Sequence, residues 1–300
     1  MGEALARFGR VGVALILGSV AVWALLLILI PHLMLIDYAF HANPGAVQKG
    51  LAREGLTLYS FLPLVDTQDD LVLSTFLRTL LTSGAITVLA LVVCYPIAYY
   101  LAKVAVGKWL HLLMLCLLVP FWVNEVLRAY AWRTLMARRG LVNELVENLG
   151  FEPIEFFNYL LPVIDANIAL FVGLIYSYVL FMVFPMFNAM ESLDRNQIEA
   201  ARDLGASWVR VHRKVVIPHA KPGIAAGCIV TFMLSAGSFI VPVLLGGRSS
   251  FWFTQAIESQ FSVLNWNGGS AYALVLELVC LLFVLAMMRL FRVGIRDIAR

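Results

Sequence analysis

The sequence contains few charged residues. Asp, Glu, Lys and Arg make up 14% of its 300 residues, whereas a soluble globular domain carries about 25%. Hydrophobic residues account for 61%, and the mean hydropathy is +0.86. Several apolar runs approach or exceed the roughly 20 residues that a helix needs to cross a bilayer. The composition excludes an ordinary soluble domain and predicts an all-α membrane protein that crosses the bilayer several times.

The sequence also lacks the patterns of a catalytic or metal site. Its four cysteines stand singly inside apolar runs, and its five histidines are scattered without metal-ligand spacing. The phosphate-binding pattern GxxxxGKS/T is missing, since "GKW" at 107–109 has neither the upstream glycine nor the Ser/Thr. We therefore expect no enzyme activity, cofactor, metal or ATP site in this chain, and no nucleic-acid partner.

Six membrane spans are predicted within one domain over residues 1–300. Their approximate ranges are 11–35, 74–101, 109–131, 166–189, 223–245 and 269–291. The first exceeds the core of about 7–15 residues in a cleavable signal peptide, so we expect it to be retained. Proline lies inside the second, third and fourth spans, at Pro96, Pro120 and Pro185. Such prolines bend helices and are tolerated where neighbouring helices satisfy the freed carbonyls.

Positive charge favours placing both termini in the cytoplasm. In that orientation fourteen of the 22 Lys and Arg residues fall on cytoplasmic segments and eight do not, although the cluster at 133–139 opposes it. The outer segments would be 37–70, 132–165 and 246–268, and the large inner loop would be 190–222. The stretch "RRGLVNELVENLGF" predicts a short amphipathic helix closed by Gly150. Asp165 is expected to be solvated or to cap the fourth span.

The inner loop holds the most polar stretch of the chain, "QIEAARDLGASWVRVHRKVVIP" at 197–218. Asp194 with Gln197 three residues later is typical of a capping box, which marks a helix start. Residues 195–204 are strong helix formers. Gly205 is expected to end this helix in the left-handed conformation. The loop therefore predicts a short helix closed by a glycine turn.

A second short helix is predicted after the turn, capped by Ser207 and stopped by Pro218. Each helix has an apolar face, formed by Ile198, Ala201 and Leu204 in the first and by Trp208, Val211 and Val215 in the second. The chain does not obviously cover these faces. They suit either another protein or the lipid surface, and composition alone leaves both open.

The same residues carry a resemblance to a known family. Glu199-Ala200-Ala201, Gly205 and Val215-x-Ile217-Pro218 match the pattern EAA-x3-G-x9-I-x-L-P, with conservative replacements at Val215 and Ile217. This is similar to the coupling loop of inner-membrane permeases in binding-protein-dependent ABC importers. The resemblance implies that the first short helix sits in a groove of a separate ATPase subunit. The implied coupling residues are Glu199, Ala200, Ala201, Leu204, Gly205, Val215, Ile217 and Pro218.

Most of the chain resembles the spermidine/putrescine permease branch of that family. The similar motifs are "YPIAYYLA" (95–102), "LVPFWVNEVLRAYAW" (118–132), "GLVNELVENLG" (140–150), "SFIVPVLLGG" (238–247) and "QFSVLNWNGGSA" (260–271). Three residues depart from the usual pattern: Leu180, Asn267 and Val123. These departures put the identity of the substrate in doubt more than the transport mechanism.

The resemblance implies the architecture and the partners. The expected fold is the type I ABC importer permease fold of the maltose and methionine importers, in a bacterial inner membrane. The expected partners are a second related permease, two ATPase subunits that bind ATP and Mg, and a periplasmic binding protein that delivers the solute.

Several residues inside the spans are candidates for the substrate pathway. Ionisable groups in membranes are functional candidates by default, so Glu277 and Glu125 qualify. Glu125 could receive a cationic amine, or could neutralise Arg128 three residues on, and the sequence slightly favours the second interpretation. The aromatic residues Trp122, Tyr130 and Trp132 could supply cation–π faces or belong to the interfacial belt. Ser235, Ser238 and Phe239 could line the path, although small residues more often allow close helix packing.

The leading hypothesis is an ABC importer permease for a polyamine such as spermidine or putrescine. Opines, quaternary amines, aminophosphonates and metal chelates are alternative substrates within the same class. A self-sufficient secondary transporter or channel would explain the spans but not the coupling loop. A membrane enzyme ranks third, because no catalytic constellation is present.

Replacement of Gly205 separates the first two classes. In an importer, Gly205→Val should abolish the coupling of ATP hydrolysis to transport, since valine opposes the left-handed turn, while the substrate cavity stays intact. ATPase and uptake assays on the purified transporter check this. Continued conduction by the variant would instead indicate a channel.

Overall fold

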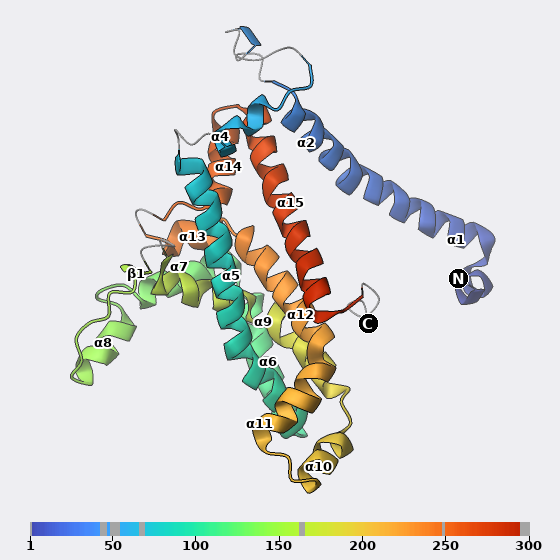
Figure 1. Cartoon of the computed structure of the whole chain (residues 1–300), viewed down its shortest axis with the longest axis vertical. Helices are drawn as coiled ribbons and strands as arrows, with labels where there is room; N and C mark the ends of the chain where they lie inside the picture. The colour runs from blue at the N-terminus through green and yellow to red at the C-terminus, as the bar shows by residue number, and fades with distance from the viewer. Residues whose placement is uncertain are drawn as a thin grey trace. The chain divides into compact units, whose positions relative to one another are not determined.

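The computed structural model describes residues 2–42, 47–48, 55–65, 70–161, 166–247 and 250–294. Helices dominate these ranges (Figure 1), and the all-α fold is confirmed. Two short strands, β1 (Tyr159–Leu161) and β2 (Ala166–Asn167), form an antiparallel pair. The chain forms two compact units: Met1–Asp70 with Ala256–Glu277, and Leu71–Gln255 with Leu278–Arg300.

Within the described ranges, five continuous helical stretches are long and apolar enough to cross a membrane. They are Val11–Phe40, Leu71–Val104, Ile168–Glu191, Trp208–Ala236 and Trp266–Phe291. In the order of the chain they comprise α1 (Gly2–Ala24), η1 (Leu25–Leu29), α2 (Ile30–Phe40), α5 (Asp70–Tyr99), η3 (Tyr100–Val104), α9 (Ile168–Glu191), α11 (Trp208–Val211), η5 (His212–Val216), α12 (Ile217–Ala236) and α15 (Trp266–Phe291). A sixth span is reached if one bent pair of helices counts as a single crossing.

The predicted third span is broken in two. Lys108–Trp122, which contains α6 (Lys108–Leu118) and η4 (Val119–Trp122), meets α7 (Glu125–Leu135) at 98°. Pro120 lies in the first turn of η4, and Asn124 then starts a new helix by accepting a hydrogen bond from the Val126 N–H at 2.8 Å. An N-cap side chain of this kind stabilises a helix start. The stretch 109–131, predicted as one span, therefore comprises two helices with a sharp bend between them.

The predicted fifth span has different ends. Its helix begins at Trp208, passes through the π-helical turn η5 and runs on to Ala236, so Pro218 does not stop a helix. Proline has no N–H to donate to the regular i→i−4 hydrogen bonds of a helix. The π turn before Pro218 changes this pattern of bonds, so the helix continues past the missing donor. After Gly237 the span breaks, and α13 (Ile240–Leu245) follows.

Shorter elements complete the chain. They are η2 (Tyr59–Phe61), α4 (Leu62–Val65), α8 (Leu141–Asn148), α10 (Arg195–Asp203) and α14 (Phe253–Ser262). α8 occupies the amphipathic stretch predicted before Gly150, which has a positive φ of 83°. Asp165 lies outside the described residues, and Asn167 caps α9 by accepting from the Leu170 N–H at 2.7 Å.

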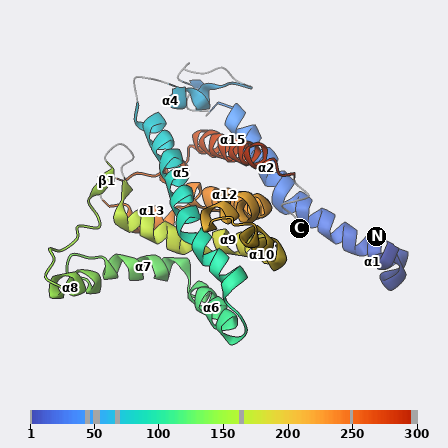
Figure 2. The ribbon, with the colours of Figure 1, turned by 60° about the horizontal axis from the view of Figure 1, so that its bottom comes forward.

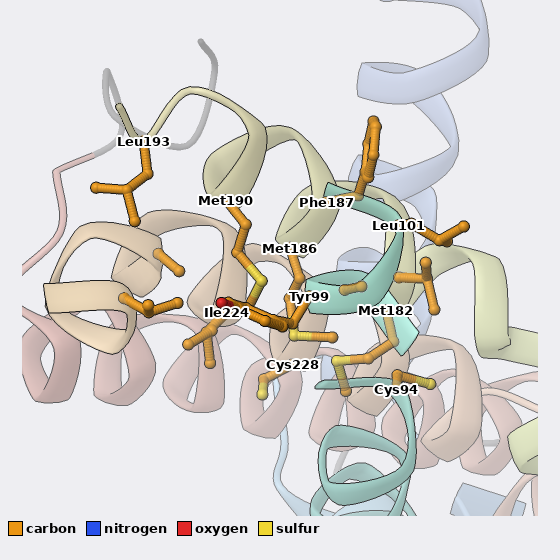
Figure 3. Close-up of a cluster of buried hydrophobic side chains, with 14 of the residues drawn as sticks. Cys94, Tyr99, Leu101, Met182, Met186, Phe187, Met190, Leu193, Ile224 and Cys228 are labelled. Carbon is orange, nitrogen blue, oxygen red and sulfur yellow. The ribbon is translucent and has the colours of Figure 1, made fainter. Parts of the chain in front are cut away.

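The core of the second unit depends on close packing of α12 against α9. A Cβ at Gly223 would collide with the Pro185 carbonyl oxygen, and a Cβ at Gly227 would lie 2.9 Å from the Met182 sulfur. Around this contact Met182, Met186 and Met190 of α9 meet Ile224 and Cys228 of α12, together with Cys94 and Tyr99 of α5 (Figure 3). Small residues bring helix backbones together in membranes, where packing drives association.

The first unit is held by polar contacts between α2 and the N-terminal part of α15. Asn267 donates from Nδ2 to the carbonyl oxygens of Tyr38 at 3.1 Å and His41 at 2.9 Å. At Asn267, where the resemblance led us to expect proline, the side-chain amide satisfies carbonyls at the end of α2.

Alanine at Gly223 should destabilise the fold. The new methyl group must force α12 away from Pro185, and overpacking of this kind costs about 1–3 kcal/mol. Gly84, inside α5, is the matched control because no atom lies within 4 Å of the position that its new methyl group would occupy. Gly84→Ala should be neutral or stabilising by about 0.5–1 kcal/mol. Thermal unfolding of the purified protein checks both, and equal melting temperatures for the two variants would contradict the packing argument.

Candidate coupling segment and substrate pathway

The predicted coupling loop at residues 190–222 is called the coupling segment below, and its first helix, α10, begins at an aspartate cap. Asp194 accepts a hydrogen bond at Oδ1 from the Asn196 N–H at 3.0 Å, as the sequence predicted. Gln197 contributes its backbone N–H to the Asp194 carbonyl at 3.1 Å. The cap therefore forms through Asp194, without the reciprocal side-chain bond of a full capping box.

Gly205 closes α10 in the left-handed conformation, with φ at 76°. The Gly205 N–H donates to the Arg202 carbonyl at 2.8 Å, and the Ala206 N–H donates to the Ala201 carbonyl at 3.0 Å. These two bonds are those of a Schellman motif, which satisfies the last carbonyls of a helix. The glycine turn predicted from the sequence is confirmed.

The coupling segment presents an uncovered apolar surface. Leu204 is 89% exposed and Val209 is 73% exposed, and Glu199 and Ala200 beside them are also exposed. Such residues seldom stand together on a surface unless a partner or lipid covers them. Figure 1 shows α10 and α11 at one end of the second unit, and Figure 2 turns this end, with α10, toward the viewer.

Other residues of the segment hold it to the unit. Ile198, Val211 and Val216 are buried in the core cluster around α9, and Val215 packs against it. Ile217 and Pro218 are exposed on the first turn of α12. Ser207 makes no side-chain bond to the helix that follows, so the predicted cap is absent there.

The two ends of the loop are fastened by hydrogen bonds. Lys103 donates from Nζ to the carbonyl oxygens of Glu191, at 3.2 Å, and Leu193. The Ser192 hydroxyl is 2.9 Å from His219 Nε2. Cationic side chains favour the negative end of a helix dipole, so Lys103 stabilises the end of α9. The loop therefore leaves a rigid base formed by α5, α9 and α12.

Glu125 and Arg128 do not form the ion pair that the sequence favoured. Glu125 accepts a hydrogen bond from the Tyr178 hydroxyl at 3.2 Å. The Arg128 guanidinium lies 4.5 Å from the centre of the Phe121 ring and 6.0 Å from that of Tyr176. Its Nε and Nη1 atoms are buried without a hydrogen-bond partner. Aromatic faces attract the guanidinium, which explains its position.

A cavity of about 500 Å³ lies beside this arginine. Its walls come from α5, α6, η4, α7 and α9, and include Phe121, Trp132 and Tyr176. Trp132 and Tyr176 meet edge to face with ring centres 5.2 Å apart. The bend between η4 and α7 brings Phe121 and Trp132 to the same cavity.

The serine candidates lie where α12 ends. Ser235 and Ser238 are buried, and the Ser238 carbonyl accepts from the Thr254 hydroxyl at 2.7 Å. Ser238 also lies close to the Tyr178 hydroxyl. Tyr178 thus stands between Glu125 and the break after α12. Sequence reasoning missed Tyr178, because a tyrosine inside an apolar run carries no signal until its contacts are known.

The remaining candidates are dispersed. Trp122 is 86% exposed, and Tyr130 and Phe239 are also exposed. Glu277 belongs to the first unit, where its carboxylate lies 3.4 Å from His32 Nε2. Within the described residues, no group of three or more His, Cys, Asp or Glu side chains is placed to hold a metal ion.

Residues 11–297 match the family described as binding-protein-dependent transport system inner membrane component. The chain belongs to this family. It is a permease subunit of an ABC importer, a membrane transport protein and not an enzyme.

Named relatives match along nearly the whole permease. The spermidine/putrescine transport system permease protein PotB of Haemophilus influenzae is 30% identical over 285 residues, covering 93% of this chain and 92% of the relative. PotB of Escherichia coli is 32% identical over 278 residues, covering 90% and 94%. The spermidine/putrescine permease PotC of Escherichia coli matches over a shorter stretch, 32% identical over 106 residues, covering 35% and 40%.

Solved structures show the same fold. A chain of a bacterial ABC transporter involved in the import of the acidic polysaccharide alginate superposes with a TM-score of 0.70 at 16% identity, covering 97% of both chains. A chain of the MetNI methionine ABC transporter gives a TM-score of 0.54 at 16% identity, covering 74% of this chain and 95% of that one. The expected importer permease fold is confirmed.

Proposed function

We propose that the permease imports polyamines such as spermidine or putrescine. The observation that carries this proposal is the identity of 30–32% to PotB permeases over 90–95% of the chain. The Glu125 carboxylate, held by Tyr178 inside the second unit, offers a counter-charge to a passing ammonium group. A carboxylate that is already oriented by a hydroxyl needs little rearrangement to receive an amine.

The proposal includes the partners and the orientation. A second permease related to PotC would complete the pathway, and a periplasmic binding protein would deliver the solute. Two ATPase subunits would bind ATP and Mg and receive Glu199, Ala200 and Leu204 of the coupling segment. Their closure would move the segment and, through it, the spans. Both termini and the loop 190–222 would face the cytoplasm, and the segments 37–70, 132–165 and 246–268 the periplasm.

Arg128 favours a second candidate, a small zwitterion such as an opine or an aminophosphonate. Arg128 is half-buried, and its buried Nε and Nη1 atoms are costly to leave without a partner unless an anionic group meets them. A polyamine has no such group, whereas a zwitterion could place its anion at Arg128 and its amine at Glu125. The same pair of residues thus separates the two substrate classes.

Uptake measurements test both candidates. Cells with and without the permease would be given labelled spermidine, with opines, quaternary amines, aminophosphonates and metal chelates as competitors. We expect uptake that depends on this chain and on ATP, and that only polyamines block. Spermidine uptake unchanged by deletion of the chain would overturn the polyamine assignment.

Charge-removing variants refine the result. Glu125→Gln should lower the maximal rate of spermidine uptake roughly tenfold or more, the loss expected when a charge-assisted hydrogen bond is removed. Arg128→Gln should leave spermidine uptake intact or raise it. The exposed Glu144 of α8 provides the matched control, Glu144→Gln. If Arg128→Gln lost the uptake of labelled spermidine, and zwitterions competed for this uptake in the wild type, the second candidate would be favoured.

A further inference from the structure

We infer that His212 and Tyr95 form a latch that transmits movement of the coupling segment to helix α5. This inference rests on the proposed function of the segment and names residues outside the coupling pattern. His212 Nδ1 and the Tyr95 hydroxyl are joined by a hydrogen bond of 2.7 Å between residues 117 positions apart. The bond ties the first residue of η5 directly to a membrane span.

The imidazole is held on several sides by aromatic rings. Its ring centre lies 4.5 Å from that of Tyr99, 4.5 Å from that of Trp208 and 5.8 Å from that of Tyr95. Tyr99 and Trp208 also meet edge to face at 5.4 Å. Two of these rings belong to α5 and one to α11, so His212 is clamped between the coupling segment and the span. Aromatic pairs in tilted or edge-to-face contacts stabilise a packing beyond the area that they bury, by about 0.5–1.5 kcal/mol each.

His212 Nε2 is buried and has no hydrogen-bond partner. Buried polar atoms are normally paired, and an exception calls for an explanation. Because the other ring nitrogen is fixed by Tyr95, that single bond sets the orientation of the ring. A leucine or phenylalanine at this position would avoid the cost of the unpartnered nitrogen, so the histidine is best explained by its bond to Tyr95.

Both backbones near the contact are π-helical. η3 (Tyr100–Val104) follows Tyr99 on α5, and η5 begins at His212 itself. π turns in otherwise α-helical stretches occur frequently at functional sites. A π turn holds one additional residue and interrupts the regular hydrogen-bond pattern of the helix. The latch therefore joins two segments that are able to move as the exposed face of α10 is displaced.

The cavity beside His212 and Tyr95 supports a positioning role for these two residues rather than a role in solute binding. It measures about 500 Å³ and is lined by Tyr95, Pro96, Tyr99, Tyr100, Val104, Trp208, Val209 and His212. No carboxylate is among these residues, so a cationic solute finds no counter-charge there. The space leaves room for the rings to shift during transport.

Variants of the two side chains in the complete transporter, reconstituted in proteoliposomes, test the latch. Tyr95→Phe removes only the hydroxyl, and His212→Gln moves the polar atoms toward the Nε2 position. We expect the stimulation of ATP hydrolysis by the spermidine-loaded binding protein to fall roughly threefold to tenfold in both, the change that corresponds to one lost hydrogen bond. His212→Asn keeps a polar atom at the Nδ1 position and should restore most of the stimulation.

Two controls separate the latch from a general loss of stability. Tyr100→Phe removes the hydroxyl of the neighbouring tyrosine, which is about half exposed, and should leave stimulation unchanged. In a double-mutant cycle, Tyr95→Phe should add nothing to His212→Gln, because both remove the same contact. Variants that stay within twofold of the wild type, or a double variant with fully additive losses, would overturn the latch.

A measurement without substrate distinguishes failure of the latch from failure of the polyamine assignment. The distance between α5 and α9 can be measured with spin labels at two exposed positions, Leu81 and Phe181, in a cysteine-free background. It is measured before and after vanadate trapping with ATP. We expect Tyr95→Phe to reduce the change in distance seen in the wild type. An undiminished change would reject the latch, whereas a wild type unresponsive to spermidine would reject only the assigned substrate.

Discussion

The structure depends on one close contact between two helices. Gly223 brings α12 so near to α9 that only hydrogen fits against the Pro185 carbonyl. Because α9 leads into the coupling segment and α12 leads out of it, the two ends of the loop share one rigid base. The exposed face of α10 is therefore presented in a fixed orientation, even though few of its own residues are buried. A partner that moves α10 must move this pair or the contacts beside it.

Irregular backbone gathers around the candidate pathway. The helix breaks at Asn124 and again after Gly237, and Tyr178 lies between these breaks with Glu125 and Ser238 near its hydroxyl. Non-helical backbone at membrane depth is tolerated where it is buried in protein or lines a water-filled space. Because Trp122, Val123 and Phe239 beside the two breaks are exposed, the broken backbone needs a partner chain or water beside it.

Local chemistry in the sequence was sufficient to predict the coupling turn. Asp194 and Gly205 act through bonds to residues two or three positions away, so their roles can be read from spacing alone. The continuous helix through Pro218 could not be predicted in this way, since the π turn before it depends on the packing of Val211 and Val216 in the core. The fold class and the ranges of most helices likewise followed from runs of apolar residues.

The candidate pathway was less predictable than the coupling segment. Glu125 and Arg128 are three residues apart, and helical spacing favoured a pair, yet tertiary contacts direct the two side chains to different partners. Tyr178 binds the carboxylate from 53 residues away, while Phe121 and Tyr176 hold the guanidinium. Such competition between local and distant partners cannot be resolved from spacing, because the distances across the bundle are set by the broken helices.

The sulfur-rich core gives the pair of helices an uneven stiffness. At Gly223, and again at Gly227, the backbone of α12 lies close to that of α9, so neither helix can approach further. The space around these contacts is filled by Met182, Met186 and Met190, whose long unbranched side chains adjust their shape at little cost. The side chains of this core can therefore repack while the two backbones stay in contact.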